Sequence, residues 1–210
     1  MRNGEIRGHV ISRLRTLGVA AALCAVAPSA LAGPACDAAL AALRDIHPGA
    51  YPTVLDGMGN TLRVRLVMND AGECLSRAYF ADSGQDRCGW MDANTRIAPV
   101  RPPAKATLNA LASTRIENAT MACPTLRRAT QEKLGWQKSG SRALRLKRNG
   151  LYDHRSVGIT LPVVNSAEGE AITWVESLSG PLAGGAGFVL LRMDAKGRWQ
   201  VDAKFPALIS

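Results

Sequence analysis

The sequence predicts an α+β protein with a mostly antiparallel sheet, a short N-terminal helix and a helical middle segment. Three patterns support this fold class. Residues 37–46 repeat apolar side chains at helical spacing. Residues 62–80 and 187–203 alternate apolar and polar side chains on both sides of a turn, as β-hairpins do. Residues 124–136 have proline in the first turn and glycine near the end, which is typical of a helix.

The turns of the two hairpins predict their registers. In the first, Asn69 stands first and Gly72 fourth, and in the second Asp194 and Gly197 hold these places, as a type I turn prefers. The first hairpin should oppose Met68 with Cys74, Leu66 with Ser76, Val64 with Ala78 and Leu62 with Phe80. The second should oppose Met193 with Trp199, Leu191 with Val201 and Val189 with Ala203, leaving Leu190 and Asp202 on the outer face.

The elements divide the chain into four parts. Residues 1–32 are expected to form a leader, 33–98 a helix with the first hairpin, 99–137 a proline-containing connector with a helix, and 138–210 an antiparallel β region. The last three parts form either one assembly or two lobes joined near the prolines. Further elements expected are a helix over 105–117, strands over 156–164 and 170–178, and a polar turn over 165–169.

The first 32 residues have the pattern of a cleavable secretory signal. An apolar run over 17–27 follows the bases Arg2, Arg7, Arg13 and Arg15. Ala30 and Ala32 are small residues at the positions that a signal peptidase recognises, so cleavage before Gly33 is predicted. Pro28 interrupts the apolar run well short of the roughly 20 residues that a spanning helix needs. The expected product is a soluble periplasmic or secreted protein, not an integral membrane protein.

Cysteines point to the same compartment. Cleavage removes Cys24 and leaves Cys36, Cys74, Cys88 and Cys123. An even number of cysteines in an oxidising compartment predicts two disulfides, for which three pairings are open. The spacing contains no C-x-x-C pair, so disulfides are favoured over a zinc site, and no metal or cofactor is expected.

The sequence offers few residues for catalysis. Only His47 and His154 remain after the leader, and His47 stands before a proline at the end of the first helix. Asp153 precedes His154, but neighbouring residues of a strand point to opposite faces, so Asp153 is not expected to orient it. The glycine-rich run over 180–187 lacks the lysine and the following helix of a phosphate-binding loop, which favours a strand connection with close backbone approach. A small hydrolase using His154 is therefore the alternative to a non-enzymatic protein.

Positive charge is concentrated in the middle of the chain. Without the leader's four arginines and one glutamate, the 26 bases and 17 acids leave a net charge of +6. Residues 101–160 hold twelve bases and three acids. The predicted basic patch consists of Arg127, Arg128, Arg142, Arg145, Lys147 and Arg148, the last three on a strand whose leucines, Leu144 and Leu146, point inward. Such a face suits anionic lipid, a wall polymer or an acidic protein, whereas export and few interleaved aromatic residues disfavour nucleic acid.

A motif over residues 51–84 suggests a binding mode. It consists of Tyr51-Pro52, Leu55, Gly59, Val64, Leu66, Asp70, Gly72 and Ser83-Gly84. With these residues the segment 51–84 resembles the opening half of the C-terminal domain of TonB-type energy transducers. The resemblance implies a partner whose extended segment adds to a sheet edge. After residue 84 the chain departs from the family, and it shows neither the family's membrane anchor nor its proline-rich stalk after the leader, so energy transduction is not expected.

The sequence therefore predicts an exported, soluble accessory or binding protein of the cell envelope. It would engage another envelope protein or an anionic polymer through a sheet edge or the basic patch. No catalytic activity is expected unless His154 serves a small hydrolase.

Overall fold

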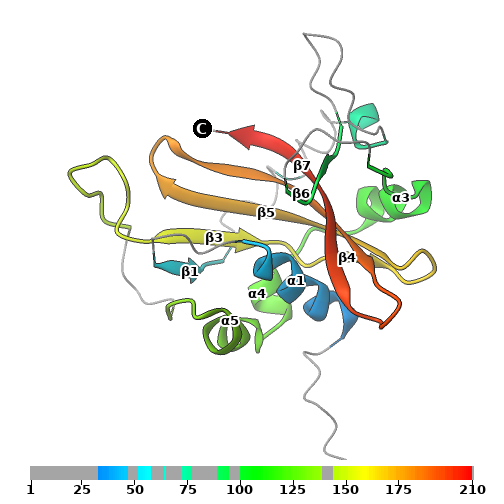
Figure 1. Cartoon of the computed structure of the whole chain (residues 1–210), viewed down its shortest axis with the longest axis horizontal. Helices are drawn as coiled ribbons and strands as arrows, with labels where there is room; N and C mark the ends of the chain where they lie inside the picture. The colour runs from blue at the N-terminus through cyan, green and yellow to red at the C-terminus, as the bar shows by residue number, and fades with distance from the viewer. Residues whose placement is uncertain are drawn as a thin grey trace, which may run out of the picture.

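The computed structural model describes residues 33–46, 52–57, 64, 72–76, 89–94, 100–138 and 144–209, so the predicted leader lies outside the described residues. The helices are α1 (Pro34–Arg44), α3 (Lys105–Ser113), α4 (Ala119–Ala122) and α5 (Leu126–Leu134), with the 3₁₀ helix η1 (Gly72–Ser76). The strands are β1 (Thr53–Leu55), β2 (Met91–Asp92), β3 (Arg155–Ile159), β4 (Val163–Asn165), β5 (Glu170–Gly180), β6 (Ala183–Met193) and β7 (Trp199–Ile209). The predicted α+β class is confirmed (Figure 1).

One mostly antiparallel sheet connects the two ends of the chain. Its order is β1-β3-β5-β6-β7-β2, and β4 pairs with β5 beside this path. Only the β1–β3 pair is parallel among the named strands. Strands β1 and β2 come from the first half of the chain and lie at opposite edges of the sheet. The N-terminal region therefore adds strands to the C-terminal sheet.

The predicted helices and most predicted strands are present. Helix α1 begins at Pro34, because proline suits the first helical position, where its missing N–H costs nothing. Helix α5 ends at Gly135, whose φ of 67° is the left-handed conformation that glycine adopts freely. Helix α3 and strands β3, β4 and β5 fall within the predicted ranges or close to them. Among the helices of the described residues, none is both long enough and apolar enough to cross a membrane.

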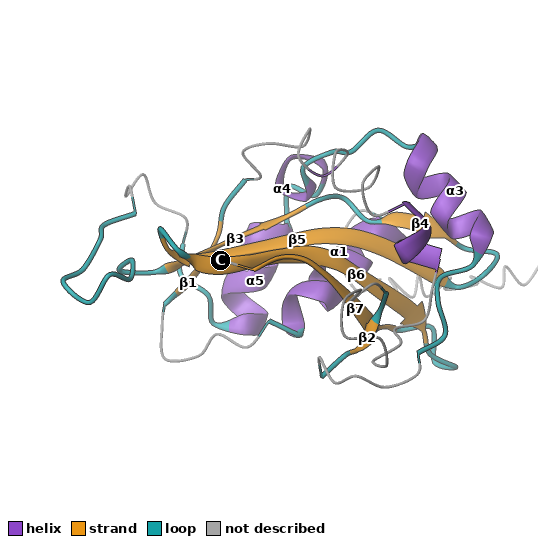
Figure 2. Ribbon diagram, turned by 90° about the horizontal axis from the view of Figure 1, so that it is seen from above, coloured by secondary structure: helices purple, strands orange, loops and turns teal. Residues whose placement is uncertain are grey.

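The segment 188–191 of strand β6 is buried on both faces, so the sheet is the middle layer of the molecule there. Val189 and Leu191 pack in the cluster that contains α1 and α5. Phe188 and Leu190 pack on the other side with Trp90 and residues of α3. Side chains alternate along a strand, so a continuous apolar run requires a cover on each face. Figure 2 shows α3 and α5 on opposite sides of the sheet.

The glycine-rich run lies mainly inside β6, and its close backbone approach is confirmed. A Cβ atom at Gly184 would lie 2.7 Å from the carbonyl oxygen of Ser177 on β5. A Cβ atom at Gly187 would overlap the carbonyl oxygen of Phe205 on β7. Glycine is therefore required where β6 is enclosed by the backbones of both neighbours.

The second hairpin confirms the predicted turn and part of the register. The Gly197 N–H donates to the Asp194 carbonyl at 2.9 Å, and Met193 opposes Trp199 and Leu191 opposes Val201 as predicted. The pairing of Val189 with Ala203 is wrong: a bulge shifts the register, so that Leu190 opposes Ala203 and Val189 opposes Lys204. The bulge lies at Asp202, whose carboxylate accepts a hydrogen bond from Arg192.

The first predicted hairpin is wrong where the structure describes it. Residues 72–76 form η1 instead of a strand, and Val64 is in helical backbone. Leu75 is buried, and its carbonyl accepts a hydrogen bond from the Trp90 indole N–H at 2.8 Å instead of from a partner strand. Tertiary contacts have overridden the alternating pattern. The other residues of this hairpin lie outside the described residues.

A disulfide attaches α1 to the end of α4. Cys36 and Cys123 are bonded, with Cα atoms 5.8 Å apart and a sequence separation of 87 residues. Cys74 is also disulfide-bonded, and Cys88 lies outside the described residues. Disulfides persist in oxidising compartments, so this bond fits an extracellular or periplasmic location.

The buried carboxylate of Glu170 joins β5 to α3. Its side chain has no exposed surface. One oxygen accepts hydrogen bonds from the Ala104 N–H and the Thr107 hydroxyl, both at 2.8 Å. The other oxygen accepts from Arg192 at 3.1 Å and from Arg101 at 3.2 Å. Ala104 is the N-cap residue of α3, so the negative charge also lies at the positive end of the helix dipole.

These contacts set the charge state of Glu170. Burial alone would raise the pKa of its carboxyl group, because a charge is poorly solvated in the interior. Hydrogen bonds from Ala104, Thr107 and Arg192 outweigh burial, so the net pKa lies below the usual value for glutamate. A lowered folded-state pKa contributes stability above the ordinary glutamate pKa, and that contribution is lost as the pH falls through the folded-state value.

The first prediction concerns this carboxylate. Glu170→Gln should lower the free energy of unfolding at pH 7 by about 3 kcal/mol, because Arg192 loses its buried partner. The difference from wild type should shrink in acid, where protonation makes the wild-type carboxyl neutral, as the glutamine amide is. Urea unfolding at neutral and acidic pH measures both effects. The matched control is Glu168→Gln, which changes an exposed residue of the preceding turn; equal stability of the two variants at pH 7 would contradict the prediction.

The second prediction concerns the disulfides. Peptide mapping without reductant should find Cys36 linked to Cys123, and Cys74 linked to Cys88 as the remaining pair of the processed chain. Replacing Cys36 and Cys123 by serine should destabilise the protein by about 4–5 kcal/mol, from the entropy of closing a loop of this length. Denaturant unfolding measures the loss. A peptide linking Cys36 to any other cysteine would show that the assignment is wrong.

Candidate functional site

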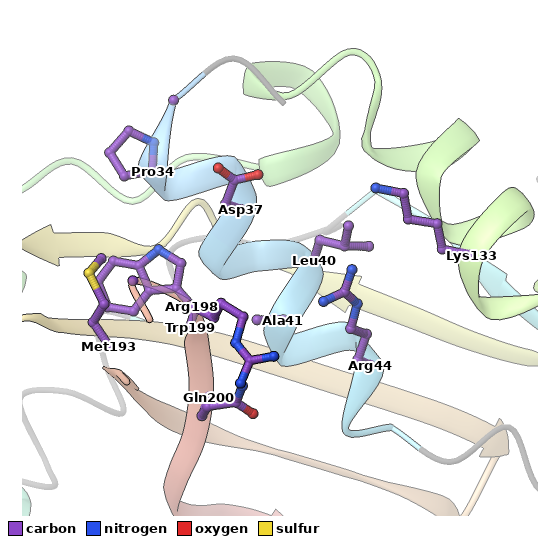
Figure 3. A pocket seen from close by; sticks show the side chains of 12 residues that line it. Pro34, Asp37, Leu40, Ala41, Arg44, Lys133, Met193, Arg198, Trp199 and Gln200 are labelled. Carbon is purple, nitrogen blue, oxygen red and sulfur yellow. The ribbon is translucent and has the colours of Figure 1, made fainter. Parts of the chain in front are cut away.

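A cleft beside α1 is the candidate functional site. It has a volume of about 530 Å³ and lies between α1, the turn that joins β6 to β7, and the end of α5 (Figure 3). The lining side chains that matter chemically are Asp37, Leu40, Arg44, Lys133, Arg198 and Trp199. We call this cavity the α1 cleft.

Apolar side chains form the inner wall of the α1 cleft. Leu40 and Trp199 belong to the core cluster and are only 3% and 7% exposed. Met193 opposes Trp199 across the hairpin and is 42% exposed, so it adds an accessible apolar surface. The wall is therefore preformed by core packing and does not depend on a ligand.

Cations dominate the charge of the α1 cleft. Three bases line it, Arg44, Lys133 and Arg198, against one acid, Asp37. Arg198 is paired with Asp194 at 2.8 Å. Within the described part of the chain, neither Arg44 nor Lys133 forms an ion pair with a carboxylate.

The two unpaired cations come from different helices. Figure 3 shows the side chains of Arg44 of α1 and Lys133 of α5 both ending beside Leu40. Two cations that face a shared cavity attract an anionic group and can donate charge-assisted hydrogen bonds to it. The arrangement is therefore suited to holding a carboxylate or a phosphate.

The α1 cleft continues along the helix. A second cavity of about 260 Å³ shares Arg44 and Trp199 with the first and extends to Asp45. A third, of about 340 Å³, also touches Asp45 and has mainly apolar walls that include Phe205 and the glycine segment of β6. A ligand with an anionic end and an apolar body would find both kinds of surface along α1.

The predicted basic patch is divided between two elements. Arg127 and Arg128 are exposed on α5, and Arg145, Lys147 and Arg148 are exposed on the loop over 144–152. Arg142 lies outside the described residues. The expected strand over 144–148 is wrong, because the loop pairs only through one bridge between Leu146 and Tyr152. Leu146 is consequently 59% exposed instead of pointing inward.

His154 contacts Asp153, although the alternation of a strand predicted that their side chains would point to opposite faces. Its Nδ1 lies 2.8 Å from Oδ1 of Asp153. The two residues stand in a bend before β3, so the alternation of a strand does not separate their side chains. The Arg145 N–H is the main cause that lowers the pKa of Asp153; partial burial opposes it, and His154 adds to the lowering. A carboxylate in contact with one ring nitrogen can fix the orientation of the imidazole.

A complete catalytic set does not form around His154 in the described residues. None of the three cavities above is lined by His154. The nearby Ser156 hydroxyl donates to Asp56 at 2.6 Å. In the described ranges, no group of three or more histidine, cysteine and acidic side chains is placed to hold a metal ion. His47 lies outside the described residues.

Comparison of the chain with protein-family models, with curated proteins and with solved structures finds no match. The resemblance of residues 51–84 to TonB-type domains therefore stays a prediction.

Sequence reasoning missed the residues of the α1 cleft. Arg44 is in the last turn of α1, where a base is explained by the helix dipole, and Lys133 fits the helical spacing of α5. Neither has a sequence neighbour that marks it as functional. Their approach depends on the packing of α1 against α5, which the Cys36–Cys123 disulfide reinforces.

Proposed function

We propose that this protein is an exported, non-enzymatic binding protein that holds an anionic component of the cell envelope in the α1 cleft. The observation that carries the proposal is the pair of unneutralised cations, Arg44 and Lys133, at a preformed cavity with an apolar wall. Arg198 also lines the cleft, but its guanidinium is already paired with Asp194.

The chemistry of the α1 cleft supports binding instead of catalysis. Its polar side chains are mainly cations, which neutralise a ligand's charge but lack a nucleophile with an adjacent base. Its apolar wall favours a ligand whose anionic group is attached to an apolar body, since both parts then leave water on binding. The leader pattern and the disulfide support an oxidising compartment outside the cytoplasm.

The contact between Asp153 and His154 favours a second candidate, a small hydrolase. An imidazole oriented by a carboxylate can act as a general base if a substrate reaches its other nitrogen. This candidate places the reaction at the start of β3 and leaves the α1 cleft without a role.

The third prediction tests the α1 cleft. Phenyl phosphate and benzoate should shift the indole N–H resonance of Trp199, and the neutral benzyl alcohol should not, because only the anions pair with Arg44 and Lys133. Replacing both cations by alanine should weaken phenyl phosphate binding about tenfold or more, as expected for lost hydrogen bonds to a charged group. NMR titration measures the dissociation constants.

A matched control removes the same charge from the exposed surface of α5. The variant with Arg127→Ala and Arg128→Ala should bind phenyl phosphate as the wild type does. Equal weakening in the two double variants would mean that only net charge matters, and the α1 cleft would lose its assignment.

The fourth prediction separates binding from hydrolysis. Protein purified from the extracytoplasmic fraction should show no turnover of ester, amide or glycan substrates above buffer. Turnover that disappears in His154→Ala would replace the binding proposal by the hydrolase. Turnover that survives this substitution would exclude His154 and point to another group.

A further inference from the structure

Three exposed leucines gather at one end of the sheet. Leu182 is 85% exposed in the turn between β5 and β6, Leu146 is 59% exposed on the loop over 144–152, and Leu178 is 37% exposed near the end of β5. They are three of the five large apolar side chains that are exposed in the described residues. Figures 1 and 2 both show the loop and the β5–β6 turn at the same end of the molecule.

Backbone contacts hold the loop against the β5–β6 turn. The Tyr152 N–H donates to the Ser179 carbonyl at 2.7 Å. Gly180 packs so closely on the loop that a Cβ atom there would lie 2.9 Å from the Gly150 carbonyl oxygen. Asp153 anchors the base of the loop by hydrogen bonds with the backbone N–H and C=O of Arg145. The leucines therefore belong to one structured surface, which we call the tip.

Cations accompany the leucines on the tip. Arg145, Lys147 and Arg148 are exposed on the loop. The one acid of the loop region, Asp153, contacts His154 and the backbone of Arg145. Residues 177–183, which span the end of β5, the turn and the first residue of β6, include no charged residue. The tip thus combines an excess of positive charge with apolar side chains that project into water.

We propose that the tip docks on an anionic lipid bilayer. Exposed leucines on a small surface are better placed at the boundary of lipid headgroups and acyl chains than in water. Cations beside them gain from the negative potential of an anionic membrane surface, with about 1 kcal/mol for each base near it. A soluble acidic partner would pair with the bases but would leave Leu182, at the extreme of the turn, without a reason for its exposure.

The tip is separate from the α1 cleft. Strand β6 begins at the tip with Ala183 and ends at the cleft with Met193. Eleven residues of extended strand span roughly 35 Å. Docking through the tip requires no ligand in the α1 cleft, so the two proposals fail or succeed independently.

Vesicle binding tests the tip. Protein purified from the extracytoplasmic fraction, with its first residue determined by mass spectrometry, is sedimented with vesicles of phosphatidylglycerol and phosphatidylcholine in equal parts, and with pure phosphatidylcholine. Binding to the anionic vesicles alone is expected. Arg145→Glu, Lys147→Glu and Arg148→Glu together should weaken it on the order of 100-fold. Leu146→Glu with Leu182→Glu should weaken binding at least about tenfold, because the bilayer can no longer bury two leucine side chains.

Two controls make the test specific. Arg127→Glu with Arg128→Glu reverses charge on α5, and Met121→Glu replaces another exposed apolar residue, on α4, that is 81% exposed. Neither should weaken binding as the tip variants do. Binding that the controls reduce as much as the tip variants, or no binding to anionic vesicles, would overturn the proposal. Binding to soluble polyglutamate would also overturn the proposal if it is as strong as binding to vesicles and the leucine substitutions leave it unchanged. The partner would then be an acidic polymer.

Discussion

The carboxylate of Glu170 has no exposed surface at the point where β5 begins, and the layers of the protein are joined through it. A buried carboxylate is tolerated only when donors satisfy its oxygens. Here the donors come from the start of α3, through Ala104 and Thr107, and from β6, through Arg192. Their attachment to one residue holds α3 against the sheet, so that the second face of β5 and β6 is closed to water.

Helices cover both faces of the sheet around residues 188–191 of β6, and the two candidate sites lie toward the ends of this strand. On one side α1 and α5 cover the sheet, and on the other α3 and Trp90 do so. The α1 cleft forms where the β6–β7 turn meets the flank of α1. The tip forms where the loop over 144–152 packs on the β5–β6 turn. Both candidate sites thus lie at places where the helices no longer cover the strands.

Sequence patterns predicted the elements whose causes are local. Helix α5 ends where Gly135 permits it, and the second turn follows from Asp194 and Gly197. Elements that depend on distant partners were missed. The bulge at Asp202 accompanies a contact with Arg192, and residues 72–76 are held by Trp90 instead of a partner strand. The α1 cleft was missed for the same reason, because Arg44 and Lys133 line one cavity only after α1 and α5 pack together.

The relation between the tip and the α1 cleft limits how they can cooperate. Strand β6 joins them, and at Gly184 and Gly187 it lies so close to the backbones of β5 and β7 that a Cβ atom would overlap them. A protein docked through the tip therefore presents the α1 cleft on the side away from the bilayer. Its anionic ligand would arrive from the aqueous compartment and not directly from the membrane below the tip. In the two proposals, attachment to the bilayer and capture of the ligand therefore take place at opposite ends of β6.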